Sequence, residues 1–328
     1  MTTRTILAGT YTDTGSKGIY AFDLTGGIMS NPRIFAEIDS PKYISVQNGL
    51  TASIGKFENG CGIAVFDEAG NELDHIVYEQ KTSCYITWKG NEIYTANYHL
   101  GTFSRILFED NHLKLDKTVE IREGAGCHEV LFHEDHIFVP ALFLDRILIF
   151  DNALAYQGSI NFPSGTGPRH GLFTRDGKTL YVLSELSNEL FVLDTDGWKL
   201  RTVIPVLPDG RTYQRGSAAI RFGNGESLIY TSTRKQDIIS VIDPHTRRVR
   251  QGAYSGGKHP RDFLIVNGYL LCANRYSDTI VCYSLDGDGA IGPELSRINV
   301  PQAVSLAVLN ENSWQMNGDG KSRLFSVL

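Results

Sequence analysis

The sequence of 328 residues lacks the features of a membrane protein, a secreted protein or a disulfide scaffold. No stretch approaches the ~18 uninterrupted apolar residues that span a bilayer, and no basic segment followed by an apolar run marks a signal peptide near Met1. The five cysteines are odd in number and form no C-x-x-C pair. A disulfide framework and a zinc knuckle are therefore not expected, and the cytoplasm, which is reducing, is the expected location.

Positive charge is not in excess either. The chain has 31 Lys and Arg residues against 37 Asp and Glu residues, a net charge of −6. This balance favours solubility and gives no general field that would attract nucleic acid or an anionic membrane, although it is compatible with a local basic patch. The sequence also has no G-x-S-x-G, Walker or dinucleotide-binding motif, so the enzyme classes that depend on these motifs are not supported.

Glycine and aromatic residues are abundant instead. Glycine occurs 33 times and Tyr and Phe together 31 times, whereas Met occurs only 3 times. This composition favours many short strands joined by tight turns over a helical bundle. At ~150 residues per domain, the length allows two domains or one large all-β unit.

A repeated pattern decides between these two. Five segments consist of a strand, a short polar turn and a second strand, and their equivalent residues are Tyr94, Phe138, Tyr181, Tyr230 and Leu271. Neighbouring positions are 41–49 residues apart. A period in the forties that is built from strands is typical of β-propeller blades.

Each segment is followed by one more strand and preceded by another, so a blade has four strands. The expected preceding strands cover residues 84–88, 127–132, 168–173, 216–222 and 259–266. Two weaker copies, over residues 6–38 and 44–78, bring the number of blades to seven. The chain starts on a second strand, and residues 300–309 supply a spare one. We therefore predict an all-β, seven-bladed propeller, a single domain over residues 1–328, whose ring is closed by a C-terminal strand joining the N-terminal blade. Residues 311–328 fit no blade.

The propeller topology also predicts where a site would lie. The connections that lead into the first strands and the turns between the second and third strands meet at one mouth of the ring, where ligand sites are common. The residues at these positions are Tyr85, Tyr98, His128, Leu142, Arg169, His170, Glu185, Ser217, Arg234, His259, Arg261 and Arg275. Any one of them could be a solvated loop charge, but the convergence of several arginines, histidines and a carboxylate on one rim indicates a site. Arginine binds carboxylates and phosphates, and His and Glu act as general acids and bases.

Several of these residues lie in motifs that resemble a known family. The stretch that starts Gly167-Pro168-Arg169-His170, the stretch Gly257-Lys258-His259-Pro260-Arg261-Asp262-Phe263 and the turn Ala96-Asn97-Tyr98 are similar to motifs of the seven-bladed lactonases of the 6-phosphogluconolactonase type. Fungal carboxy-muconate lactonizing enzymes share that fold. The resemblance extends to about residue 310.

The resemblance implies a lactone hydrolase with a small anionic lactone as substrate. It implies catalytic roles for His128, Arg169, His170, Glu185 and Arg234, and substrate-binding roles for Asn97, Tyr98, Lys258, Arg261 and Arg275. Arg261 and Lys258 are the candidates for holding a phosphate. We expect no metal, no cofactor, no nucleic-acid or membrane partner, and a monomer or a weak homo-oligomer.

The sequence departs from the family pattern at two turns. The fourth blade has Ala141-Leu142-Phe143-Leu144-Asp145 where an Asp-Leu-Gly turn is usual, and the sixth has Ser232-Thr233-Arg234-Lys235 where Ser-Asn-Arg-Gly is usual. The first change makes one side of the mouth more apolar, so the identity of the substrate stays open.

Three functions therefore remain. The first is metal-independent hydrolysis of a sugar or sugar-phosphate lactone, with Glu185, His128 or His170 activating water. The second is muconate-type lactonizing or cycloisomerase chemistry on an unsaturated diacid. The third is a non-catalytic propeller scaffold. Against the scaffold, none of the three tryptophans is followed by Asp, so the W-D signature of interaction propellers is absent.

Overall fold

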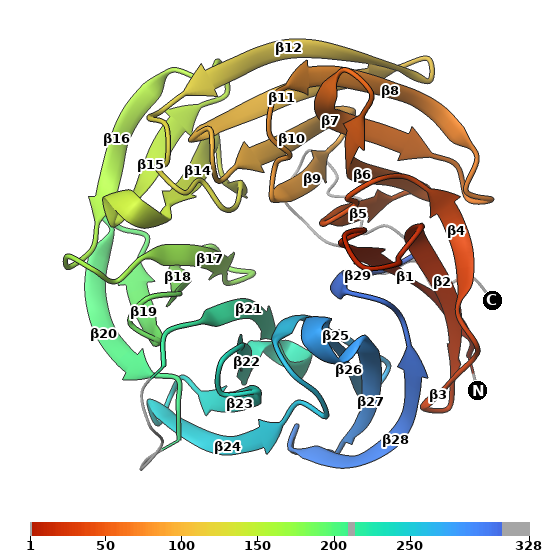
Figure 1. Cartoon of the computed structure of the whole chain (residues 1–328). Helices are drawn as coiled ribbons and strands as arrows, with labels where there is room; N and C mark the ends of the chain where they lie inside the picture. Colours follow the sequence, from red (N-terminus) through yellow and green to blue (C-terminus); the bar gives the residue numbers. More distant parts are fainter. Residues whose placement is uncertain (1, 209–213, 310–328) are drawn as a thin grey trace, which may run out of the picture.

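Seven antiparallel sheets surround a common axis in the computed structural model, which describes residues 2–208 and 214–309 (Figure 1). Six sheets have four strands in sequential order, and the sheet at the N-terminus has five. In each blade the first strand lies nearest the axis and the last at the outer edge (Figure 1). The predicted seven-bladed propeller is therefore confirmed. Residues 311–328, which fit no blade in the sequence pattern, lie outside the described residues.

The strands alternate along the chain with short turns. Blade 1 combines β29 (Ala303–Val308), β1 (Arg4–Thr10), β2 (Gly18–Thr25), β3 (Ile28–Met29) and β4 (Arg33–Glu37). Blades 2 and 3 consist of β5 (Ile44–Gln47), β6 (Leu50–Phe57), β7 (Gly60–Phe66), β8 (Glu72–Glu79), β9 (Tyr85–Lys89), β10 (Glu92–Asn97), β11 (Thr102–Glu109) and β12 (His112–Glu120).

The remaining blades repeat this order. Blades 4 and 5 consist of β13 (Leu131–His133), β14 (His136–Ala141), β15 (Arg146–Asp151), β16 (Tyr156–Asn161), β17 (Pro168–Phe173), β18 (Thr179–Ser184), β19 (Glu189–Asp194) and β20 (Lys199–Pro205). Blades 6 and 7 consist of β21 (Ser217–Phe222), β22 (Ile229–Thr233), β23 (Ile238–Asp243), β24 (Arg248–Tyr254), β25 (Pro260–Val266), β26 (Tyr269–Asn274), β27 (Thr279–Leu285) and β28 (Ile291–Asn299). The 3₁₀ turns are η1 (Leu142–Leu144), η2 (Asn224–Glu226) and η3 (Arg275–Ser277).

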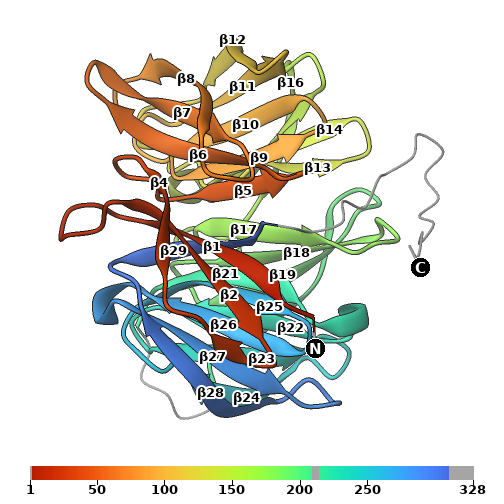
Figure 2. The same ribbon diagram turned by 90° about the vertical axis from the view of Figure 1, so that its right-hand side faces the viewer.

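The ring is closed by pairing between the two ends of the described chain. Strand β29 runs antiparallel to β1, with Leu7 opposite Ala307 and Ala8 opposite Leu306. The side view shows β29 beside β1 (Figure 2). The closure predicted from the spare C-terminal strand is confirmed, and it removes the exposed edge that an open array would leave.

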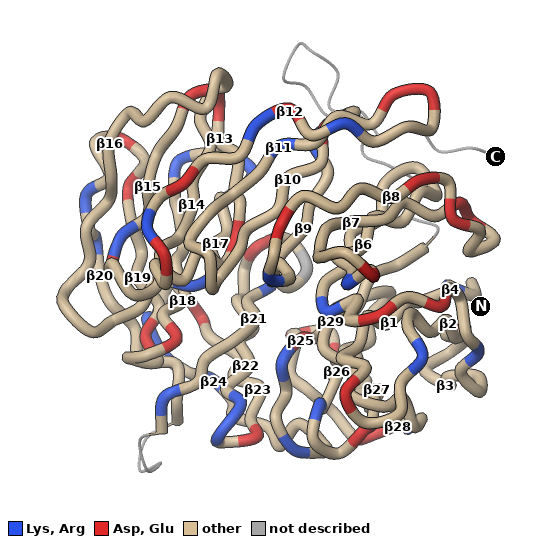
Figure 3. The backbone as a smooth tube through the Cα atoms, turned by 45° about the horizontal axis from the view of Figure 1, so that its top comes forward, with Lys and Arg blue, Asp and Glu red and all other residues tan. Residues whose placement is uncertain are grey.

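The hydrophobic core is divided among the interfaces between blades. Seven clusters of buried apolar side chains each join two neighbouring sheets; between blades 4 and 5, for example, Phe138 and Ile147 pack with Leu180 and Phe191. Polar side chains can therefore occupy the axis. Acidic and basic residues are interspersed over the blades (Figure 3). In the part of the chain that the structure describes, we find no helix with the length and apolarity needed to cross a membrane.

The first strands of blades 5 and 7 are irregular at their beginnings. Pairing of β17 with β18 shifts register between Pro168 and His170, and pairing of β25 with β26 shifts between Pro260 and Asp262. The extra residues are Arg169 and Arg261. A β-bulge changes the direction of the side chain it carries and is common beside functional sites.

The first strand of blade 4 is shorter than the pattern predicts. The expected strand over residues 127–132 is represented by β13, which begins at Leu131, and by an isolated bridge between Cys127 and Ala141. The facing strand β14 contains Pro140, which has no N–H to donate to a ladder. The residues between the bridge and β13, His128 among them, are therefore outside regular pairing.

Candidate active site

One face of the ring, here called the mouth face, is formed by the connections into the first strands and the turns between the second and third strands. The bulge in β17 places Arg169 and His170 at this face, although they are consecutive and would alternate in a regular strand. Glu185 follows β18 and Arg234 follows β22, at equivalent turns of blades 5 and 6. Their N–H groups donate to the carbonyls of Gly167 and Gly216, at 2.8 Å and 3.0 Å, which fixes both turns.

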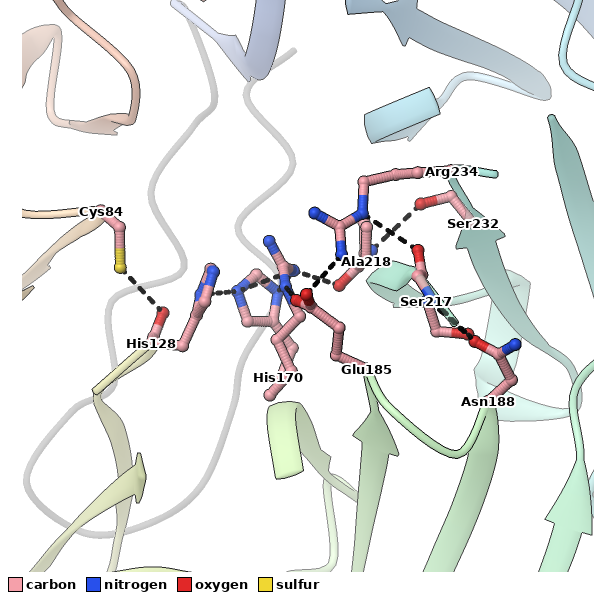
Figure 4. Close-up of polar contacts among 12 residues, drawn as sticks. Cys84, His128, His170, Glu185, Asn188, Ser217, Ala218, Ser232 and Arg234 are labelled. Atoms are coloured by element: carbon pink, nitrogen blue, oxygen red, sulfur yellow. Dashed lines mark hydrogen bonds and ion pairs between the residues drawn. The ribbon is translucent and has the colours of Figure 1, made fainter. Parts of the chain in front are cut away.

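Glu185 is held between Arg169 and Arg234, and Figure 4 shows it beside Arg234. Arg169 Nε lies 3.0 Å from Oε2 of Glu185, and Arg234 Nη2 lies 2.7 Å from Oε1. Arg234 Nε also donates to the Gly216 carbonyl at 3.0 Å, and Arg169 Nη1 donates to the Ala218 carbonyl. The side chains are 2% (Arg169), 12% (Arg234) and 16% (Glu185) exposed, so the three charges are largely removed from water and carry a net charge of about +1.

The electrostatics keep these groups ionised. Burial opposes ionisation of Glu185, but the positive charges of Arg234 and Arg169 outweigh it and lower the pKa of the carboxyl group. Burial lowers the pKa of Arg169 to about 10, which still leaves the guanidinium charged at neutral pH. Glu185 is therefore a fixed carboxylate and not a proton carrier near neutrality.

Two histidines lie beside this clamp. Nδ1 of His128 is 3.1 Å from Nε2 of His170, and Nη1 of Arg169 is 3.3 Å from the same nitrogen of His170. Both imidazoles are buried. Burial, together with the charge of Arg169, lowers the pKa of each well below its usual range, so both rings are neutral at pH 7.

The turn after β10 in blade 3 contributes the ring of Tyr98 to the site. The side-chain amide of Asn97 stabilises this turn. The Tyr98 ring packs edge-on against His128, with 5.9 Å between centroids, and against Phe143 at 5.5 Å. Asn97 is buried, and its Nδ2 donates to Glu79 at 2.8 Å while its Oδ1 accepts the N–H of Leu100 at 2.9 Å. Asn97 is thus occupied in forming the turn that presents Tyr98.

The remaining predicted residues belong to blade 7. The guanidinium carbons of Arg275 and Arg261 lie 3.7 Å and 5.6 Å from the centre of the Tyr11 ring. Arg275 is also 3.5 Å from Asp13, and Lys258 is exposed. The predicted residues are therefore divided between a cluster on blades 3 to 6 and a second group on blade 7.

A comparison with known families gives this arrangement a context. Residues 5–308 match the family described as lactonase, 7-bladed beta-propeller. The chain belongs to this lactonase family. Among its relatives, the 6-phosphogluconolactonase of Bacillus subtilis strain 168 is 29% identical over 347 aligned positions, which cover 92% of this chain and 97% of that protein.

Solved structures of other proteins show the same fold. A protein from Lactobacillus plantarum superposes with a TM-score of 0.88 at 24% identity, covering 94% of this chain and 100% of that one. The periplasmic gluconolactonase of Pseudomonas aeruginosa has a TM-score of 0.81 at 21% identity, covering 94% and 99%. At these identities the likeness supports the fold alone.

The lactonase propeller has polar residues on its axis that sequence reasoning missed. Oε2 of Glu129 accepts the N–H of Gly171 at 2.6 Å, and Arg221 Nη2 lies 2.7 Å from Oδ1 of Asp262. Oδ2 of Asp262 accepts the N–H of Leu306 at 2.9 Å. Glu129 and Asp262 directly follow His128 and Arg261 in the sequence, but the irregular strand starts that bring both neighbours to the axis are seen only in the structure.

No metal centre is evident in the described ranges 2–208 and 214–309, where no three His, Cys, Asp or Glu side chains gather. Metal independence itself stays a prediction.

Proposed function

We propose that this protein hydrolyses a sugar-type lactone at the cluster of His128, Arg169, His170, Glu185 and Arg234. The observation that carries the proposal is a pair of buried arginines, fixed by one carboxylate, beside a hydrogen-bonded pair of neutral histidines. Membership of the lactonase family and the relationship to a 6-phosphogluconolactonase support the reaction class.

His128 is the proposed general base. A guanidinium can only donate hydrogen bonds, but Nη1 of Arg169 lies 3.3 Å from Nε2 and 3.4 Å from Nδ1 of His170, so this contact does not distinguish the two ring nitrogens. We propose the tautomer in which Nε2 of His170 is the acceptor. His128 then donates from Nδ1, and its own Nε2 carries the free lone pair. His128 lies against Tyr98 and His170 lies against Tyr85, each with 5.9 Å between ring centroids. Because this tautomer leaves the free lone pair on His128, we assign water activation to His128. His170 orients the His128 ring through their hydrogen bond.

The reaction then balances as follows. Nε2 of His128 takes a proton from water as the water oxygen bonds to the lactone carbonyl carbon, and the negative charge moves to the carbonyl oxygen. Arg169 and Arg234 stabilise that oxyanion. When the intermediate collapses, the ring C–O bond breaks and the proton on His128 passes to the leaving alkoxide oxygen. The product is a hydroxy acid, whose carboxyl group releases its proton to solvent at neutral pH and remains beside the arginines as a carboxylate.

Glu185 is a positioning residue in this scheme. Both of its oxygens are already bonded to guanidinium groups, and its lowered pKa makes it a weak base. Its proposed role is to hold the guanidinium groups of Arg169 and Arg234 close together, so that both stabilise the developing oxyanion.

The test is hydrolysis of gluconolactone and of its 6-phosphate, with spontaneous hydrolysis subtracted. We expect His128→Gln to lower kcat by about 10²- to 10⁴-fold, because general base catalysis is lost. Glu185→Gln is expected to lower activity less than His128→Gln, and the reverse order would assign the base to Glu185. Hydrolysis rates with the wild-type protein that equal the spontaneous rates in buffer would exclude both substrates. Activity that survives a chelator would support metal independence.

Muconate-type chemistry on an unsaturated diacid remains the alternative. It is favoured by the apolar rim, since the exposed Phe143 packs on Tyr98 beside His128. Product analysis with a muconate separates the two, because cyclisation forms a lactone and hydrolysis consumes one.

A further inference from the structure

Two neighbouring hydrogen bonds join the segment of His128 in blade 4 to strand β17 in blade 5. Nδ1 of His128 lies 3.1 Å from Nε2 of His170. One residue further along both segments, Oε2 of Glu129 accepts the N–H of Gly171 at 2.6 Å. Glu129 is only 6% exposed, so bulk water competes little for this second bond. The second bond takes no part in the proposed reaction, but it lies directly beside the pair of histidines that does.

The segment of His128 is not fixed by a regular strand ladder. It lies between the isolated bridge at Cys127 and the start of β13 at Leu131. The N–H of His128 donates to the Pro140 carbonyl at 3.0 Å, but Pro140 has no N–H with which to return a ladder bond. The position of His128 relative to blade 5 therefore depends on contacts across the boundary between the two blades.

The carboxyl group of Glu129 is suited to this contact because it is mainly neutral. Burial raises its pKa to about 8, although the Gly171 hydrogen bond and the charges of Arg221 and Arg169 oppose the shift. At pH 7 the group therefore accepts the Gly171 N–H without adding a negative charge next to His128. A carboxylate at this place would favour the imidazolium form and raise the pKa of the proposed base.

We infer that Glu129 is a positioning residue for the proposed base: its hydrogen bond to Gly171 holds the His128 segment against β17, so that Nδ1 of His128 meets Nε2 of His170. This inference rests on the proposed lactone hydrolysis for its link to turnover. Residues 128 and 129 are consecutive, as are residues 170 and 171, so the two hydrogen bonds fix both the separation and the relative rotation of the two segments. The bond between the histidines alone would leave the rotation free.

Two substitutions of nearly the same size as Glu129 test the role of its hydrogen bond. Glu129→Met offers no strong acceptor to the Gly171 N–H, whereas Glu129→Gln keeps an oxygen for it and cannot ionise. For gluconolactone, Glu129→Met should lower kcat by about 10- to 100-fold with little change in KM, because the base is misaligned, whereas Glu129→Gln should keep kcat within about threefold.

Asp74 provides the matched control. Its Oδ2 also accepts a backbone N–H from the neighbouring blade, that of Leu113 at 2.7 Å, but this bond joins the outer strands β8 and β12. Asp74→Ala should therefore keep the wild-type kcat. Urea unfolding of each variant shows that the rates are measured on folded protein, and Glu129→Leu, which also lacks an acceptor, replaces Glu129→Met if the latter does not fold.

The titration of His128 gives a readout that does not need turnover. The charged and titratable side chains that act on or contact His128 from neighbouring elements are Arg169 and His170 of β17, Arg234 after β22, Arg261 of β25, Tyr98 after β10 and Cys84 before β9. In the wild type, burial, Arg169 and Arg261 hold the pKa of His128 well below 6.5. In Glu129→Met the ring should leave its buried place, and its pKa should rise towards 6.5, whereas Glu129→Gln should keep it low. NMR titration measures both values, with His128→Gln to assign the signal.

Each outcome has a definite meaning. A raised His128 pKa in Glu129→Met, with a low pKa in Glu129→Gln, supports the inference even if the wild type hydrolyses no lactone, in which case only the proposed function fails. An unchanged kcat and an unchanged His128 pKa in Glu129→Met would overturn it. Equal losses in Glu129→Met and Glu129→Gln would also contradict it, because the hydrogen bond to Gly171 would then not be what matters.

Discussion

At the scale of single residues, Glu129 shows how burial on the axis determines titration. Its carboxyl group is almost inaccessible to solvent and accepts one hydrogen bond, from Gly171, while the charges of Arg221 and Arg169 act on it from a greater distance. Burial outweighs these favourable interactions and raises the pKa to about 8. The folded protein therefore binds a proton at Glu129 that the unfolded chain releases near its ordinary pKa.

This difference predicts a pH-dependent stability. Because the folded-state pKa is raised, Glu129 contributes full stability below about pH 4.5, and that contribution is lost as the pH rises to about 8. Glu129→Gln, which cannot ionise and keeps an oxygen for Gly171, should flatten this dependence. Urea unfolding at pH 5 and pH 9 should show the variant to be the more stable protein at pH 9. A variant that is less stable than wild type at both values would contradict the prediction.

The proposed base makes a second prediction about pH. Burial, Arg169 and Arg261 lower the pKa of His128, so the neutral form persists well below pH 6.5. The acid limb of kcat/KM for gluconolactone should therefore lie well below pH 6.5. Arg261→Ala removes one of the charges and should move that limb upward. An acid limb near 6.5 in the wild type would argue against His128 as the base.

The convergence of the proposed catalytic residues was predictable from the sequence because they occupy equivalent positions in successive repeats. Glu185 and Arg234 stand four residues after Tyr181 and Tyr230, and His128 and Arg169 stand second in the stretches 127–132 and 168–173. Glu129 was missed because a strand pattern that alternates sides gives no sign that two neighbouring residues both face the axis.

At the scale of strands, the bulges and the short first strand of blade 4 matter as much for the site as the four-strand repeat does. The repeat predicted four strands per blade, and every sheet has at least four. The bulges at Arg169 and Arg261 and the gap caused by Pro140 depend on the hydrogen-bond register, which periodicity does not report. These irregular segments position the arginines and histidines of the mouth face.

One bulge gives a prediction about an individual strand. Pairing between β7 and β8 shifts between Cys61 and Gly62, and a Cβ atom added at Gly62 would lie 1.8 Å from the carbonyl oxygen of Ile76. Gly62→Ala should therefore force the two backbones apart and lower the free energy of unfolding by about 1–3 kcal/mol. Gly287, where an added Cβ meets nothing within 4 Å, is the matched control, and Gly287→Ala should change stability little. Equal unfolding midpoints for the two variants would show that the strands can separate without cost.

At the scale of the whole molecule, the ring is held by side chains at the axis as well as by strand pairing. Asp262 of blade 7 binds Arg221 of blade 6 at 2.7 Å and the N–H of Leu306, in the closing strand of blade 1, at 2.9 Å. The pairing of β29 with β1 was predictable from the spare C-terminal strand. The connection through Asp262 was not, because it joins residues from three blades whose approach exists only in the closed ring.

The last prediction tests this connection against a surface pair of the same type. Asp262→Ala leaves Arg221 without its partner beside the axis and frees the Leu306 N–H, so unfolding in urea should show a loss of about 3 kcal/mol. Asp194 forms an equally short pair with Arg201, also at 2.7 Å, but the two side chains are 32% and 48% exposed. Because water and salt screen an exposed pair, Asp194→Ala should change stability little. Similar losses in both variants would mean that the Asp262 contacts add nothing specific to ring closure, whereas a large loss confined to Asp262→Ala places part of the closure energy at the axis.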